Sequence, residues 1–151
     1  MASINTGRVV LGGLLAGLVI NLGEFLASVL IFADAYAEMM EALGLAEPGG
    51  TAMALFVIMG FLGGMVMVWV YAGIRPRFGA GPKTAAMAGL VAWILWYFFP
   101  TVGYSAMGMY SMDMTMILML VWGLVEFQLA AQAGAWFYQE SQGGTAGAPT
   151  M

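Results

Sequence analysis

Four apolar stretches of more than twenty residues each make up most of the sequence. A helix needs about 20 apolar residues to cross the hydrocarbon core of a bilayer, and each stretch reaches that length. Only 8% of the 151 residues are charged, against about 25% in soluble domains, and 62% are hydrophobic. We therefore predict an all-α polytopic membrane protein. It consists of one four-helix transmembrane domain (1–140), with spans at about 9–32, 51–74, 83–103 and 114–138, and a flexible cytoplasmic tail (141–151).

The sequence contains no cysteine and no histidine. Disulfides, thiolate metal sites, histidine-ligated haem and nucleophiles that depend on a histidine base are therefore excluded. A basic patch is also missing, so we expect no nucleic-acid partner. We predict a protein that is not an enzyme, has no catalytic residues and no cofactor, and has the lipid bilayer as its main partner.

The charged residues divide between the two sides of the predicted bundle. The 34–50 and 104–113 connections carry acidic residues and no lysine or arginine. The basic residues all lie at the N-terminus or between the second and third spans: Arg8, Arg75, Arg77 and Lys83. By the positive-inside rule, the basic side and both termini are predicted to be cytoplasmic.

A short amphipathic helix is predicted directly after the first span. Acidic residues from Asp34 to Glu41 share one helical face, whereas apolar residues from Tyr36 to Leu43 share another, and Gly44 supplies the stop. This helix either lies on the outer membrane surface or caps the bundle and concentrates cations at its mouth. We expect no signal-peptide cleavage before it, because the apolar run is longer than the roughly 7–15 residues of a secretory h-region.

Glu24 and Glu126 are lone carboxylates inside otherwise apolar spans. A charge at the centre of a membrane helix costs about 2.5–3.5 kcal/mol, so such residues usually face a bundle interior and are functional candidates. Asn21 and Ser28 share the helical face of Glu24. These four residues form the predicted membrane-embedded polar site for a proton or cation.

The two carboxylates are expected at different depths. At 1.5 Å per residue, Glu24 lies about 24 Å from Arg8 and Glu126 about 20 Å from Asp113, so contact requires tilted or shifted helices. Without a basic partner at that depth, burial favours neutral carboxyl groups. Three interpretations stay open: hydrogen bonding that only fixes helix packing, a proton or cation pathway, and an interface with another protomer or a partner subunit.

Small residues at helical spacing indicate where the helices meet, because membrane helices associate through close packing of small side chains. The predicted packing seam consists of Gly17, Gly60, Gly64, Gly89 and Gly123. Trp93, Trp96 and Tyr97 lie nearer the middle of the third span. They either serve lipid-facing or core packing, or wall a cavity for an apolar ligand.

Fifteen methionines are many for 151 residues, and they are densest from Met107 to Met119. Met112, Met116 and Met119 share one helical face, and thioethers are ligands that suit Cu(I). The alternative is that these methionines are flexible apolar filler. A Cu(I) site on these three residues is therefore a secondary hypothesis.

Three segments, GGLLAGLVINLGEFL, YAGIRPRFGAGPKTAAMAGL and LVWGLVEFQLAAQAGAWFY, resemble a family of small uncharacterised bacterial inner-membrane proteins with four helices. The resemblance implies a multi-pass protein of the bacterial inner membrane and carries over no catalytic residue. Two function classes follow. One is a small proton- or cation-coupled transporter or channel, expected to be a homo-oligomer because four short helices rarely enclose a pathway alone. The other is an accessory or scaffold subunit of a larger membrane complex.

Overall fold

The computed structural model describes residues 4–138, which are helical apart from short connections. No β-strand occurs among these residues. Two π-helical segments, η1 and η2, interrupt the first and third long helices. In chain order the elements are α1 (Thr6–Phe25), η1 (Leu26–Ile31), α2 (Ala33–Ala42), α3 (Gly50–Phe78), α4 (Pro82–Trp93), η2 (Ile94–Phe98), α5 (Phe99–Ala106) and α6 (Met114–Phe137).

Four continuous helices are long and apolar enough to cross a membrane: Thr6–Ile31, Gly50–Phe78, Pro82–Ala106 and Met114–Phe137. The predicted all-α, four-helix architecture is confirmed. Two helix starts follow from signals in the local sequence. The Asn5 side chain caps α1 by accepting the backbone N–H of Arg8 (3.2 Å), and Pro82 occupies the first turn of α4. The predicted tail over 141–151 lies outside the described residues.

The second long helix ends at Phe78, beyond the predicted end near residue 74. Arg75 and Arg77 lie in its last turn, where positive charge is favourable beside the negative end of the helix dipole. Gly79 then adopts a positive φ of 84°, which ends the helix. Arg75 and Arg77 therefore belong to the end of α3 and not to the connection that follows it.

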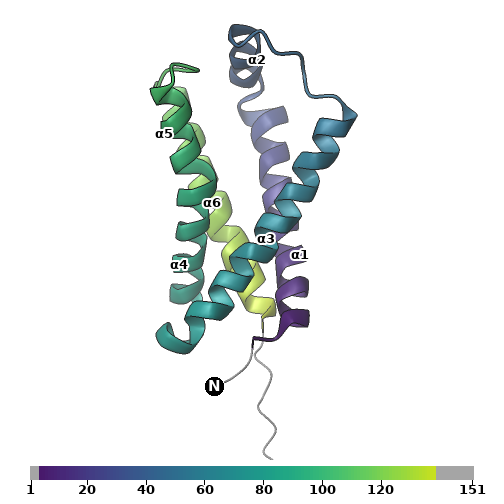
Figure 1. The fold of residues 1–151 in the computed structure, drawn as a ribbon, viewed down its shortest axis with the longest axis vertical. Helices are drawn as coiled ribbons and strands as arrows, with labels where there is room; N and C mark the ends of the chain where they lie inside the picture. The colour runs from purple at the N-terminus through teal and green to yellow at the C-terminus, as the bar shows by residue number, and fades with distance from the viewer. Residues whose placement is uncertain (1–3, 139–151) are drawn as a thin grey trace, which may run out of the picture.

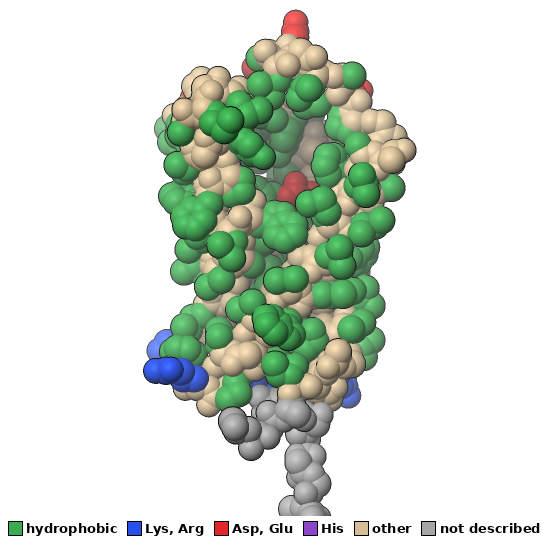
Figure 2. Space-filling model, in the orientation of Figure 1, with side chains coloured by type: hydrophobic (Ala, Val, Ile, Leu, Met, Phe, Trp, Pro, Cys, Tyr) green, Lys and Arg blue, Asp and Glu red, His purple; other side chains and the backbone are tan. Residues whose placement is uncertain are grey.

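Charge distinguishes the two ends of the bundle (Figures 1 and 2). The basic end holds the start of α1, the α3–α4 connection and the end of α6. The acidic end holds α2 and the 107–113 connection. Figure 1 shows α3 running obliquely across the bundle, so that it contacts α1, α4 and α6 but diverges from α5 toward the acidic end. Helix α6 also packs against α1 and α4.

Glycines let the helix backbones touch, and the structure places all five predicted seam glycines at helix contacts. A Cβ on Gly17 would lie 2.6 Å from the Cα of Phe61, and one on Gly89 would lie 2.9 Å from the Cβ of Ala131. The sequence prediction missed an equally close contact between α1 and α6. A Cβ on Gly12 would lie 2.6 Å from the carbonyl oxygen of Gly134. These separations are shorter than van der Waals contact, so each seam depends on glycine.

Packing is tight toward the basic end and looser toward the acidic end. Most fully buried side chains lie in the basic half, among them Ala16, Val68, Ala88 and Ala130. Fewer side chains are buried in the acidic half of the described chain, among them Ala27, Thr101, Met119 and Glu126. The space-filling view shows a hollow in the face toward the acidic end, with acidic side chains at its inner limit (Figure 2).

Both π-helical segments have a local cause. The Ser28 hydroxyl donates to the Glu24 carbonyl (2.7 Å), which is the group that an α-helix would pair with the N–H of residue 28. The backbone hydrogen bonds that follow join residues five apart, as in the bond from the Phe32 N–H to the Ala27 carbonyl (2.8 Å). The other segment ends two residues before Pro100, whose ring has no N–H and crowds the carbonyl four residues earlier, inside the segment. Neither segment was predicted.

The amphipathic helix predicted after the first span is confirmed as α2. Its acidic residues, including Glu38 and Glu41, are exposed, whereas Tyr36 and Met39 are half-buried against the bundle. Gly44 ends the helix at φ 66°, and the N–H of Leu45 bonds back to the carbonyl of Met40 (2.9 Å). The apolar face of α2 therefore covers part of the acidic end.

Candidate functional site: a buried carboxylate pair

The structure brings Glu24 and Glu126 to one place in the bundle. Glu126 is only 3% exposed and Glu24 is half-buried. The carboxyl carbon of Glu126 lies 2.5 Å from where a Cβ on Gly23 would be, so the Glu126 carboxylate rests on the α1 backbone beside Glu24. The two residues therefore lie at different backbone levels, as expected, while the Glu126 side chain spans most of that difference.

The depth expectation considered the backbone only and left out side-chain direction. The Gly12–Gly134 contact sets the register between α1 and α6. From that contact, the Glu24 backbone lies about 18 Å and the Glu126 backbone about 12 Å toward the acidic end, at 1.5 Å per residue, a difference of about one helical turn. Side chains lean toward the N-terminus of their helix, and α1 and α6 are antiparallel (Figure 1). Glu24 and Glu126 therefore lean toward each other and close the remaining gap.

Two aromatic side chains donate hydrogen bonds to the carboxylates. The Tyr97 hydroxyl of η2 donates to Oε1 of Glu24, and the Trp122 indole N–H donates to Oε2 of Glu126 (3.2 Å). The second oxygen of Glu126, Oε1, is buried and has no hydrogen-bond partner among the described residues. A buried acceptor without a partner is rare and calls for an explanation such as a proton, an ion or water.

Tyr97 is held in place by α6. Its ring lies over Gly123, where a Cβ would come within 2.8 Å of the ring, and it makes an edge-to-face contact with Phe127 at 5.5 Å. Nearby, the Trp93 indole donates to the Leu120 carbonyl (3.0 Å) and fixes the third long helix against α6. The sequence prediction considered Tyr97 either as a packing residue or as the wall of a cavity. Its partner glycine, Gly123, was the available signal that an aromatic ring packs there.

No positive charge neutralises the carboxylate pair within residues 4–138. The four basic residues all lie near the basic end, whereas the pair lies in the acidic half. Burial, together with the carboxylates of Glu24 and Glu126, raises the pKa of Tyr36, a residue of α2, to about 12. The site therefore consists of two carboxyl groups, the Tyr97 hydroxyl and the Trp122 indole, with Tyr36 on the side of the acidic end.

Asn21 and Ser28 serve helix packing and geometry and do not bind the carboxylates. The Asn21 amide donates to the carbonyls of Gly17 (2.8 Å) and Val57 (3.2 Å), so it joins α1 to α3. The Ser28 hydroxyl donates to the backbone carbonyl of Glu24 and not to its carboxylate. The polar residues predicted on one face of the first span therefore have different neighbours. Glu24 faces Tyr97 and α6, while Asn21 faces α3.

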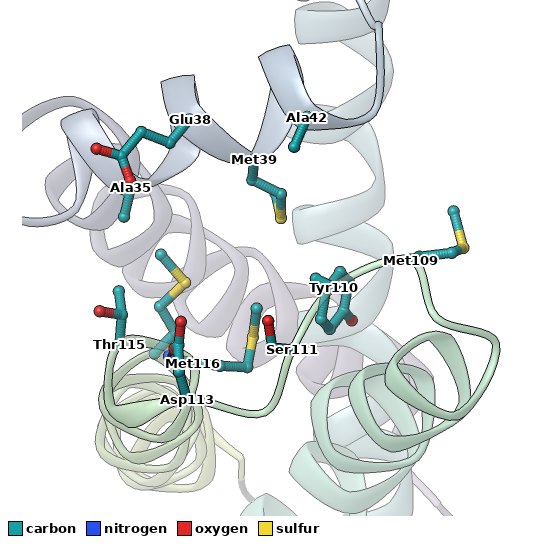
Figure 3. Close-up of a pocket in the computed structure, with 11 residues that line it drawn as sticks. Ala35, Glu38, Met39, Ala42, Met109, Tyr110, Ser111, Asp113, Thr115 and Met116 are labelled. Carbon is teal, nitrogen blue, oxygen red and sulfur yellow. Dashed lines mark hydrogen bonds between the residues drawn. The ribbon is translucent and has the colours of Figure 1, made fainter.

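A separate pocket of about 290 Å³ opens at the acidic end, between α2, the 107–113 connection and the start of α6 (Figure 3). Met116 and Met119 of the predicted methionine set line it, but Met112 does not. Met39 and Met109 also line it. Two of the three predicted methionines therefore share this pocket. The rest of the lining combines alanines with oxygen-bearing side chains: Ala35, Glu38, Ala42, Tyr110, Ser111, Asp113 and Thr115.

Comparisons with known proteins found no matching family model, no matching curated protein and no matching solved structure. The resemblance to small four-helix inner-membrane proteins therefore stays a prediction, and the candidate site rests on its own geometry.

Proposed function

We propose that this chain is a multi-pass protein of the bacterial inner membrane, with its basic end in the cytoplasm, that moves protons or a coupled cation through the Glu24–Glu126 pair. One observation carries the proposal. Within residues 4–138, Oε1 of Glu126 is buried without a hydrogen-bond partner beside a second carboxyl group, and no basic side chain lies nearby to balance the charge. Two adjacent carboxylates in a low dielectric cannot both stay ionised, so the pair holds at least one proton or a cation in its place.

The surroundings of the pair support exchange from the acidic end. Packing closes the basic half, whereas the face toward the acidic end is hollowed down to the level of acidic side chains (Figure 2). Glu24 is half-buried and Glu126 nearly fully buried, so a proton would enter at Glu24 and pass to Glu126. The Tyr97 hydroxyl both donates and accepts, so it can relay a proton while holding Glu24 in position.

π-helical segments support the same role. Glu24 directly precedes Phe25 and η1, and Tyr97 lies inside η2. A π-helical turn has poorer hydrogen bonding than an α-helical turn and occurs frequently at functional sites. Both helices that supply this hydrogen bond are therefore interrupted at the level of the bond, where a change in helix geometry would open or close access to the pair.

Proton binding can be tested without knowing the transported substrate. In infrared difference spectra of the purified protein, a pH step should change the C=O band of a protonated carboxylic acid. Glu126→Gln should remove most of that signal. Glu41→Gln, which removes an exposed carboxylate of α2, is the matched control and should leave the signal unchanged. An identical band in the wild type and in both Glu24→Gln and Glu126→Gln would refute proton exchange at the pair.

Flux in proteoliposomes gives the functional measurement. An imposed pH gradient should produce proton movement above that of empty liposomes, and Glu126→Gln should lower the rate at least tenfold while Glu41→Gln keeps it. Gln keeps the shape of Glu and its capacity for hydrogen bonds, so a folded Gln variant isolates the loss of the titrating group. Unchanged flux in Glu24→Gln and Glu126→Gln would exclude transport through these residues.

A second candidate function, a non-catalytic accessory or scaffold subunit, is favoured by the hydrogen bond from Tyr97 to Glu24. This bond joins the third long helix to α1, as an interhelical tie does. In that case Tyr97→Phe should lower stability, whereas Glu126→Gln should leave both stability and flux unchanged. In both cases we propose a protein that is not an enzyme, and for the transporter a homo-oligomer.

A further inference from the structure

Thioethers from two separate segments converge on the acidic-end pocket. Met39 reaches it from α2, and Met116 and Met119 reach it from the first turns of α6. Figure 3 shows Met39 pointing toward the start of α6 and Met116 extending from α6 into the same space, whereas Met109 points away. Met119 lines the pocket and is only 9% exposed, so it belongs to the buried side of the pocket. These three residues are named the thioether cluster.

The thioether cluster borders open space. Methionine that acts as filler closes a gap in the core. Here the side chains surround a cavity of about 290 Å³, which exceeds the roughly 30 Å³ that one water molecule occupies in the liquid. Asp113 fixes the start of α6 by accepting the backbone N–H of Met116 (2.9 Å), so the Met116 backbone is held in place before any ligand arrives.

The ligand chemistry of the pocket selects a soft cation. The chain has no cysteine and no histidine, so sulfur comes only from thioethers, which suit Cu(I) over Zn²⁺ or Cu²⁺. Ag(I) has the same charge and the same preference for soft ligands. Thioethers are neutral and leave the charge of the ion uncompensated. The Glu38 and Asp113 side chains at the pocket lie close enough to stabilise that charge and to raise the local cation concentration.

We propose that the thioether cluster of Met39, Met116 and Met119 binds one soft monovalent cation, Cu(I) or Ag(I), at the acidic end. The ion is bound without redox change and without release of a proton from its sulfur ligands. This site is separate from the carboxylate pair and does not depend on the proposed proton exchange. Compared with the set predicted from sequence, Met39 replaces Met112, because α2 folds over the start of α6.

The test measures metal binding to the full-length protein in detergent, after removal of any histidine tag. Ag(I) in chloride-free buffer is the air-stable probe, and Cu(I) is measured by competition with a chromophoric Cu(I) chelator under reducing conditions. Equilibrium dialysis should give one bound ion per chain. The pocket variant M39L/M116L/M119L should lose at least tenfold in affinity, because leucine keeps the approximate volume but has no sulfur.

A matched control removes the same number of methionines at the same end. Met107, Met112 and Met114 are 75%, 41% and 69% exposed and do not line the pocket. M107L/M112L/M114L should therefore bind like the wild type. Equal losses in the two triple variants would show scattered surface binding and would overturn the proposal, as would no binding by the wild type or full binding by the pocket variant.

Two further measurements keep the test decisive if the pocket variant does not fold. The single substitution Met39→Leu lies in α2, outside the four long helices, and should weaken binding at least tenfold on its own. X-ray absorption of the bound Cu(I) should show sulfur neighbours. A first shell of oxygen alone would refute the thioether cluster, as would unchanged affinity in Met39→Leu.

Discussion

Gly23→Ala should push the Glu126 carboxylate out of its position. A Cβ at residue 23 would lie 2.5 Å from Cδ and 2.6 Å from Cγ of Glu126, and the three nearest atoms all belong to this side chain. Ordinary contacts between such atoms are about 3.5–4.0 Å, so the carboxyl group must move by about 1 Å. Glu126 is 3% exposed, so it has little free space to move into.

The magnitude has two parts. Overpacking a well-packed interior costs about 1–3 kcal/mol. Moving Oε2 by about 1 Å also breaks its 3.2 Å bond from the Trp122 indole, which adds about 1 kcal/mol for a hydrogen bond between groups within a membrane protein. We therefore expect Gly23→Ala to lower the free energy of unfolding by about 2–4 kcal/mol. Gly73→Ala in α3, where no atom lies within 4 Å of the new Cβ, should change it by less than about 0.5 kcal/mol.

Two variants of Glu126 test whether its side chain causes the loss of stability in Gly23→Ala. On Glu126→Ala the clashing atoms are gone, so adding Gly23→Ala should cost nearly nothing. On Glu126→Gln the shape is kept, so the full cost should return. The assay is reversible unfolding in mixed micelles with increasing SDS, followed by circular dichroism, for the single variants and both double variants. If Gly23→Ala costs the same on Glu126→Ala as on the wild type, Glu126 does not lie against Gly23 and the site geometry is wrong.

Two other predictions concern α1 and α2. Asn21→Leu keeps the approximate shape of the side chain but removes the hydrogen bonds to the Gly17 and Val57 carbonyls. The free energy of unfolding should therefore fall by about 1–2 kcal/mol in the same SDS assay. No loss would show that Asn21 does not join α1 to α3. An unfolded tyrosine ionises near pH 10 and folded Tyr36 near 12, so the free energy of unfolding should decrease as the pH rises from about 10 to 12. Tyr36→Phe should make this decrease smaller. Unfolding is measured against pH, and tyrosinate absorbance reports the ionisation directly.

The fold could be predicted because membrane crossing imposes a length and a composition on each helix. Pro82 and Asn5 marked two helix starts correctly, and the alternating acidic and apolar residues before Gly44 marked α2. The π-helical segments could not be predicted from local periodicity. Their sequences, LASVLI and ILWYF, are apolar and suit an ordinary helix. Their causes are single groups nearby, the Ser28 hydroxyl and the ring of Pro100.

The candidate site could be predicted only in part. Glu24 and Glu126 were identifiable because a carboxylate in an apolar span is unfavourable without a role. That they lie beside each other was not, because α1 and α6 are the first and last helices, and their register depends on the Gly12–Gly134 approach. Tyr97 looks like any interior aromatic residue in the sequence. Its role emerges from the hydrogen bond to a helix that precedes it by more than seventy residues.

The position of the pair also explains why we favour proton exchange over simple packing. Interhelical ties stabilise a bundle most where neighbours exclude water, and in this protein that region is the basic half, closed by backbone contacts such as Gly13 against Met65 and Gly12 against Gly134. Glu24 and Glu126 instead lie where this close packing ends and the π-helical segments begin. Exchange requires this boundary position, because one carboxyl group must meet water or a cation while the other stays sealed from the basic end.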